Sequence, residues 1–155
     1  MGYPSRKVLL ALHDAQRTTC LSAWLREHGY GIVRARDGAS ALLAVHEQQP
    51  DVVVADADLP ILDGYQFIAA LRSRPETRRF PVILLTPCDD EAETARGCAT
   101  GADLCLPQQG SPSDLLLSLE RILCMPERAE RSAHFVPCRP QTHSSINPTF
   151  ARDDR

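Results

Sequence analysis

Short apolar runs alternate with longer amphipathic segments along most of the chain. Strands are predicted at residues 8–12, 31–35, 52–55, 81–86 and 102–106, and the continuous apolar runs at 8–12 and 52–55 indicate buried strands. Helices are predicted between and after them, at residues 15–27, 39–47, 64–73, 89–100 and beyond Ser111. Because a helix follows each of these strands, we expect an α/β fold in which a parallel sheet carries helices on both faces.

Turn and capping residues agree with several of these helix ends. Gly29 stands where a glycine commonly ends a helix, and Pro75 lies just beyond the third predicted helix. Ser111 and Asp114 form the pattern of a capping box, with Pro112 at the first helical position. These signals support the alternation of strands and helices.

The alternating pattern stops near residue 125. Beyond it the chain is polar and rich in Ser, Thr and Arg, and prolines recur through it. With 155 residues in all, the chain suits one domain over residues 1–124 and a flexible extension over residues 125–155.

Composition narrows the class of protein. A net charge of −3 and a pI near 5.9 argue against electrostatic binding to nucleic acid. No apolar stretch is long enough to cross a membrane, and the run from Val8 to Leu12 is too short for a signal peptide. The six cysteines include no Cys-x-x-Cys pair, and several lie in apolar segments, as reduced, packed thiols do. We expect a cytoplasmic protein without nucleic-acid or membrane partners.

The third predicted strand ends in a cluster of acids. Asp56 and Asp58 follow the apolar run, and Pro60 and Asp63-Gly64 come soon after. Ligands of parallel sheets bind beyond the carboxyl ends of the strands, so these two carboxylates lie where chemistry is expected. The alternative is a loop of solvated aspartates with a helix cap at Asp63.

A metal ion and a phosphoryl group would both suit these acids. With strand order 2-1-3-4-5, Asp14, Asp56 and Thr86 would converge at one edge of the sheet. Carboxylate and backbone oxygens suit Mg²⁺, which keeps several waters and takes few protein ligands. A carboxylate beside Mg²⁺ could attack a phosphoryl group as a nucleophile, and Thr86 could donate to a phosphoryl oxygen.

Further motifs occur in a specific order along the chain. They are Gly29-Tyr30, Arg36-Asp37-Gly38-Ala39, Pro50-Asp51, Asp56-x-x-Leu-Pro60 with Asp63-Gly64, Pro81-Val-Ile-Leu-Leu-Thr86 and Gly101-Ala102-Asp103. In this order and spacing, residues 7 to about 124 resemble the receiver domain of bacterial two-component response regulators. The resemblance implies a flavodoxin-like, doubly wound (βα)5 sandwich of three layers with strand order 2-1-3-4-5.

The resemblance also implies roles for residues and partners. Asp56 would be the phospho-accepting aspartate, and Thr86 would be the switch hydroxyl. Asp14, Asp56 and the backbone carbonyl of Asp58 would hold Mg²⁺. A sensor histidine kinase or a phosphotransfer protein would act upstream. A downstream protein, or a second copy of the chain, would bind the face formed by the fourth helix, the fifth strand and the fifth helix.

The sequence departs from the family at four positions of this site. His13 replaces one of two acids after the first strand, and Gln108 replaces a lysine after the fifth strand. Pro87 lacks the N–H that would donate to the phosphoryl group, and Cys105 replaces the switch aromatic. Since each lost charge-assisted contact is worth about 1.5–3 kcal/mol, we expect a poorly held phosphorylated state, weakly coupled to the partner face. Weak binding of Mg²⁺ is expected as well.

His13 has two interpretations. It could be a metal ligand or a titrating cation beside Asp56. It could also fill the place of the missing acid and bond to a neighbour, and we favour this second interpretation.

Two classes of function compete. The first is a stand-alone receiver domain that acts through protein contacts, either with Asp56 as a working phosphoacceptor or as a phosphorylation-independent pseudo-receiver adaptor. The second is an enzyme, because Asp56-Ala-Asp58 resembles the Asp-x-Asp signature of haloacid-dehalogenase-type, Mg²⁺-dependent phosphatases. Four features argue against an enzyme: the motif lies on the third strand, Pro60 follows closely, no lysine is suitably placed, and a cap domain is lacking. We therefore expect a signalling domain and no enzyme.

Overall fold

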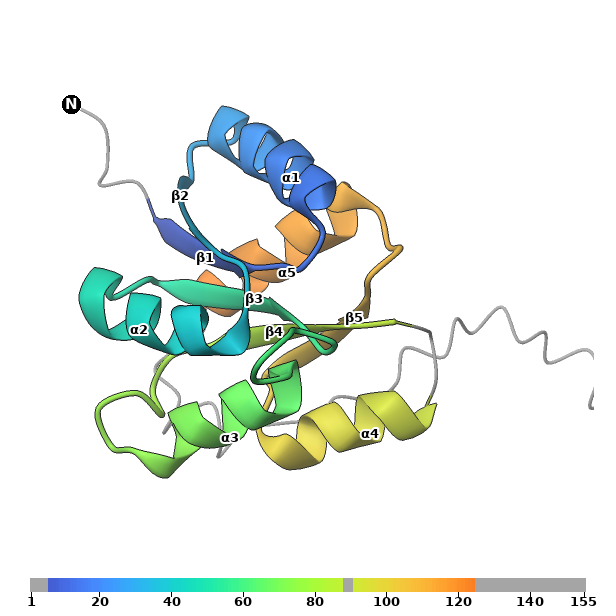
Figure 1. Ribbon diagram of the computed structural model, residues 1–155. Coiled ribbons are helices and arrows are strands. Elements are labelled where there is room, and N and C mark those ends of the chain that lie inside the picture. Colours follow the sequence, from blue (N-terminus) through green and yellow to red (C-terminus); the bar gives the residue numbers. More distant parts are fainter. Residues whose placement is uncertain (1–5, 88–90, 125–155) are drawn as a thin grey trace, which may run out of the picture.

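Residues 6–87 and 91–124 are described by a computed structural model, which forms a sheet with helices on both sides (Figure 1). In chain order its elements are β1 (Lys7–Ala11), α1 (Ala15–Glu27), β2 (Gly31–Ala35), α2 (Gly38–Gln48), β3 (Val52–Asp56), α3 (Gly64–Ser73), β4 (Val82–Thr86), α4 (Glu91–Thr100), β5 (Leu104–Pro107) and α5 (Pro112–Cys124). Neighbouring strands are parallel, in the order β2-β1-β3-β4-β5. The predicted fold class and strand order are confirmed.

The element boundaries agree closely with the sequence pattern. The bounds of α1, β2 and α3 are those predicted. β5 begins at Leu104, later than predicted, because the N–H of Ala102 still bonds to the carbonyl of Gly97 in α4. Residues 89 and 90 of the predicted fourth helix and the predicted extension at 125–155 lie outside the described residues.

The helix ends make the contacts that the sequence predicts. Gly29 has a φ of +91°, and the N–H of Tyr30 bonds back to the Leu25 carbonyl at 3.1 Å, which closes α1. Oγ of Ser111 accepts from the N–H of Asp114 at 3.2 Å and so caps α5. Within the described ranges, no helix combines the length and the apolarity that crossing a membrane requires.

The sheet separates two hydrophobic cores. α1 and α5 cover one face, and α2, α3 and α4 cover the other (Figure 1). Along β3, Val52 and Val54 pack towards α1 and α5, whereas Val53 and Ala55 pack towards α2 and α3. Because side chains alternate along a strand, Asp56 continues the row of Val52 and Val54 and faces α1. This alternation decides which helix can reach the carboxylate.

Candidate functional site

Polar residues from separate segments meet at the carboxyl edge of the sheet, in what we call the strand-end site (Asp14, Asp56, Asp58, Thr86 and Gln108). Asp56 ends β3, and Thr86 ends the neighbouring strand β4. Asp14 follows β1, and Gln108 follows β5. The topology thus places Asp14, Asp56 and Thr86 at one edge, as the strand order predicts.

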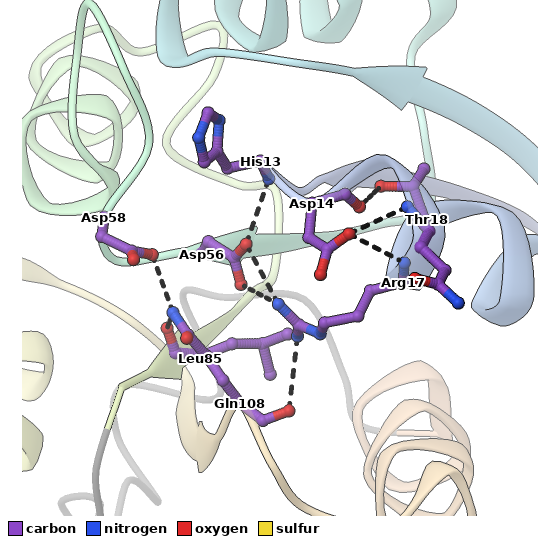
Figure 2. A network of polar contacts seen from close by, with 9 residues as sticks. His13, Asp14, Arg17, Thr18, Asp56, Asp58, Leu85 and Gln108 are labelled. Atoms are coloured by element: carbon purple, nitrogen blue, oxygen red, sulfur yellow. Dashed lines mark hydrogen bonds and ion pairs between the residues drawn. The ribbon is translucent and has the colours of Figure 1, made fainter.

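Asp56 is the buried centre of this site. Only 1% of its surface is exposed, and the backbone N–H of His13 donates to its Oδ2 at 3.1 Å. Nη1 of Arg17 lies 3.4 Å from both carboxylate oxygens (Figure 2). Burial raises the pKa of Asp56 above its ordinary value, although the charge of Arg17 and the hydrogen bond from His13 oppose that rise. The chain itself therefore supplies the cation that faces the buried carboxylate.

Arg17 is a member of the site that the sequence analysis missed. It lies in the first turn of α1, and its Nη2 also donates to the backbone carbonyl of Gln108 at 3.4 Å. The signal lay in the helix pattern, because Arg17 precedes Leu21 by four residues and Leu25 by eight and so shares their inward-facing stripe. Since α1 begins at the carboxyl edge of the sheet, a long side chain on this stripe reaches the strand ends.

Asp14 caps helix α1. Its Oδ1 accepts from the backbone N–H groups of Gln16 at 2.9 Å and Arg17 at 3.3 Å. This is the ordinary role of an aspartate before the first turn of a helix. Its assignment as a metal ligand stays a prediction, and the cap engages its Oδ1.

Gln108 takes part in the site as a neutral donor. Its Nε2 donates to Oδ1 of Asp58 at 2.8 Å and to the carbonyl of Leu85 at 3.3 Å (Figure 2). The amide therefore bonds to the exposed Asp58 and brings no charge to Asp56. The role of Gln108 as the substitute for a family lysine stays a prediction.

The one lysine of the sequence lies at the opposite edge of the sheet. Lys7 begins β1, and its Nζ donates to the carbonyl of Gln48 at 2.9 Å. Among residues 6–87 and 91–124, Arg17 is therefore the only cationic side chain paired with Asp56.

The other predicted residues of the site are His13, Thr86 and Pro87. His13 is exposed, and its ring points away from Asp56 (Figure 2). This arrangement favours the interpretation in which His13 fills the place of the missing acid, with its backbone N–H as the contact. Thr86 is buried, and its Oγ1 lies 3.4 Å from the Leu106 carbonyl. Pro87, which is exposed, has no N–H to offer.

Helix α4 is anchored to α3 beside the predicted partner face. The hydroxyl of Tyr65 donates to the carboxylate of Glu93, and the guanidinium of Arg96 lies 3.9 Å from the centroid of the Tyr65 ring. Burial raises the pKa of Tyr65, and the hydrogen bond and charge of Glu93 add to that rise. Cys105, at the predicted switch position, is half-buried with its Sγ 3.7 Å from the Thr94 carbonyl. None of these contacts involves a residue of the strand-end site.

The contacts already made at the site decide how well it fits Mg²⁺. Both oxygens of Asp56 face the guanidinium of Arg17, and Oδ1 of Asp14 is engaged in capping. In the part of the chain that the structure describes, no group of three or more His, Cys, Asp or Glu side chains is placed to hold a metal. The observed arrangement therefore does not fit Mg²⁺, because the positive charge of Arg17 faces the oxygens of Asp56 that would bind the metal ion.

Comparison with known proteins bears on the whole described domain. A family model for the response regulator receiver domain matches residues 8–120. A probable transcriptional regulator, ycf27 of Guillardia theta, is 34% identical over 130 residues, which are 84% of this chain and 50% of that protein. The chain spans about half the length of the curated relatives it matches, which are named as transcriptional regulators.

Solved structures with the same fold include two receivers that share more than a quarter of the sequence. The chemotaxis response regulator CheY4 of Vibrio cholerae is 28% identical with a TM-score of 0.72, over 77% of this chain and 99% of that one. The receiver domain of sensor histidine kinase PA1611 from Pseudomonas aeruginosa is 26% identical with a TM-score of 0.73, over 79% and 100%. Its structure contains a magnesium ion coordinated in the active-site cleft.

Proposed function

The chain belongs to the family of response regulator receiver domains, and we propose that it signals through protein contacts without relying on a phosphoryl group at Asp56. Receiver domains are signalling modules of two-component systems, so a role in signal transduction follows from the family. The distinguishing feature of this chain is the state of its acceptor carboxylate. The pairing of Asp56 with Arg17 is the observation that carries the proposal.

The physical reason is that a phosphoryl group on Asp56 would find few partners. The lysine position holds Gln108, whose amide is bonded to Asp58, and Pro87 offers no N–H. The carboxylate would also have to release Arg17 before it could attack. Each missing charge-assisted contact weakens the phosphorylated state by about 1.5–3 kcal/mol.

The second candidate is a phosphoacceptor with slow or weak control. It is favoured by the placement of Asp56 and Thr86 at the ends of neighbouring strands, as the family resemblance requires. In this candidate Arg17 would turn towards the phosphoryl oxygens, which a guanidinium binds well. A measurable label on Asp56 distinguishes the two candidates.

An enzymatic role receives no support from the site. The carboxylate of Asp58, the acid/base of the phosphatase alternative, is engaged by Gln108. The family match over residues 8–120 includes both aspartates of the motif. We therefore propose that the chain is not an enzyme.

Partner contact is assigned to the face of α4, β5 and α5. Leu117 on α5 is 58% exposed, and Arg121, one helical turn further, is also exposed. A groove of about 900 Å³ borders this face and is lined in part by Arg17, Cys105 and Arg121. The proposed partners are a sensor histidine kinase or phosphotransfer protein, a downstream protein, or a second copy of the chain. The absence of nucleic-acid partners, the stand-alone character and the cytoplasmic location stay predictions.

The test is the intact mass of the protein after incubation with Mg²⁺ and acetyl phosphate. We expect no gain of a phosphoryl group, with a conventional receiver domain as the positive control and Asp56→Asn as the matched blank. Binding of a partner should be the same with and without a beryllofluoride mimic. Stoichiometric labelling of the parent chain that disappears in Asp56→Asn would establish the second candidate instead.

A further inference from the structure

We propose that Arg17 is an internal counter-cation that keeps divalent metal ions away from Asp56, so that removing its charge opens a latent metal site. The inference rests on the proposed receiver function. It goes further by giving a role to a residue that neither the motifs nor the family resemblance assigns.

The first support is the geometry of the guanidinium. Nη1 lies 3.4 Å from each oxygen of Asp56, and Nη2 lies 3.4 Å from the carbonyl of Gln108. One side chain thus joins α1, the end of β3 and the segment after β5 (Figure 2). Both oxygens through which Asp56 would bind a metal ion face this cation.

The second support is the burial of the carboxylate. The side chain of Asp56 is 2% exposed, and a buried carboxylate requires a positive partner or a set of hydrogen bonds. The described partners are the guanidinium of Arg17 and the N–H of His13. A metal ion and a guanidinium on the same two oxygens would repel each other, so either cation excludes the other.

The third support is the open groove beside Arg17, into which its side chain could move. Its side chain is 29% exposed and lines the groove of about 900 Å³ beside α5. A metal ion could therefore bind only by displacing Arg17 towards the groove, at the cost of the ion pair. Asp14 and the backbone carbonyl of Asp58, which the family resemblance implies as ligands, would be the further oxygen donors.

The experiment is a titration with Mn²⁺ alone, followed by electron paramagnetic resonance, without any phosphoryl donor. Arg17→Met keeps the aliphatic stem beside Leu21 and removes the charge. We expect it to bind Mn²⁺ at least about tenfold more tightly than the parent, because the competing charge is gone. The exposed Arg26, nine residues further along the same helix, gives the matched control Arg26→Met, which should behave as the parent.

The gain must depend on Asp56. The double variant Arg17→Met/Asp56→Asn should lose it, and circular dichroism should show that each variant is folded. Arg17→Gln, which keeps a neutral donor at the same position, should bind Mn²⁺ as Arg17→Met does if the charge is what matters. Equal Mn²⁺ affinity in the parent, Arg17→Met and Arg17→Gln would overturn the proposal, as would a gain that survives Asp56→Asn.

A measurement on the parent chain covers the case in which Arg17 variants do not fold. The side-chain NMR signal of Arg17 should not shift when Mg²⁺ is added at millimolar concentration. A shift that shows release of the Arg17 side chain from Asp56 would overturn the proposal. These results are independent of labelling by acetyl phosphate. If the Arg17 variants bind Mn²⁺ no better than the parent and Asp56 is not phosphorylated, only the role proposed for Arg17 is wrong. If the Arg17 variants gain Mn²⁺ affinity but Asp56 of the parent is phosphorylated, only the proposed function is wrong.

Discussion

The amide of Gln108, at the position where the family resemblance implies a lysine, donates to the carboxylate of Asp58 at 2.8 Å. An amide supplies hydrogen bonds without charge. The positive charge of the site comes instead from Arg17, whose Nη1 is 3.4 Å from both oxygens of Asp56. The cation that faces Asp56 therefore comes from α1 and not from the segment after β5.

Restoring the phosphoryl clamp, by which we mean a cation at position 108 and a backbone N–H at position 87, should restore the response to phosphoryl mimics. Gln108→Lys supplies a cation and Pro87→Ala supplies a backbone N–H. Because these groups would hold different oxygens of one charge, the double variant should respond far more than either single change. Its affinity for beryllofluoride, measured by calorimetry, should rise by about tenfold or more, since one such contact is worth about 1.5–3 kcal/mol.

The neighbouring exposed glutamine provides the control for this change. Gln109→Lys adds the same charge one residue away and should leave the affinity near that of the parent. If the double variant binds the mimic while partner binding stays flat, the domain is a phosphate-independent adaptor. A parent chain that already binds the mimic as tightly as the double variant would show that the argument from the missing clamp is wrong.

Removing Arg17 should destabilise the fold through Asp56. Loss of one member of a buried ion pair costs about 3–5 kcal/mol, and we expect about 1–2 kcal/mol here because Arg17 is partly exposed. Asp56→Asn in the Arg17→Ala background should recover much of the loss, since no unpaired carboxylate remains. Urea denaturation of the four proteins of this cycle measures the coupling, and additive effects would contradict it.

Replacing the capping residue of α1 should separate its structural role from a metal role. Asp14→Ala removes the bonds to Gln16 and Arg17 and should cost about 1 kcal/mol. Asp14→Ser keeps a capping oxygen and should retain most of the stability. Thermal unfolding in EDTA measures both variants, and equal losses in the two would argue against the cap as the source of stabilisation.

The hydrogen bond between Tyr65 and Glu93, which anchors α4, should make the stability of the fold depend on pH in the alkaline range. The pKa of Tyr65 is raised in the folded protein, so its contribution to stability is fully present below about pH 10 and is lost as pH rises towards the folded-state pKa. Tyr65→Phe should lose about 1 kcal/mol at neutral pH with its bond to Glu93, yet lose less stability above pH ~10 than the parent. Urea midpoints at pH 7 and at about pH 11 test this sign.

Tyr30 supplies the comparison for this experiment. Its pKa is also raised, chiefly by burial, and it is unchanged in Tyr65→Phe. Any difference between that variant and the parent therefore reports on Tyr65. A larger alkaline loss in the variant than in the parent would contradict the expected sign.

Association through the face of α4, β5 and α5 should respond to its exposed charges. Arg121→Glu reverses a charge beside Leu117, and Arg96→Glu removes the cation over the Tyr65 ring. Both should weaken self-association in sedimentation velocity or binding to a kinase or phosphotransfer partner. Arg26→Glu on α1 is the control for net charge. If Arg121→Glu and Arg96→Glu leave a detected complex unchanged, the contact lies elsewhere.

The sequence by itself determined the architecture. The continuous run Val52–Ala55 indicated a strand covered on both faces, and the glycine at position 29 indicated where α1 ends. Those inferences hold because burial and backbone conformation are read locally, from neighbours along the chain. The placement of Asp56 and Thr86 at one edge followed from the strand order and needed no further information.

Only the tertiary structure decided what faces Asp56. The family resemblance implies that a lysine is missing after β5, but it does not show that Arg17, 39 residues from Asp56 in the sequence, faces that carboxylate. That pairing depends on the alternation of side chains along β3, which turns Asp56 towards α1. It also depends on the position of Arg17 on the inward-facing side of α1. Either pattern could be seen alone in the sequence. Their meeting is decided by the packing of α1 on that face, because a side-chain contact requires the relative position of two elements and local patterns carry no such distance.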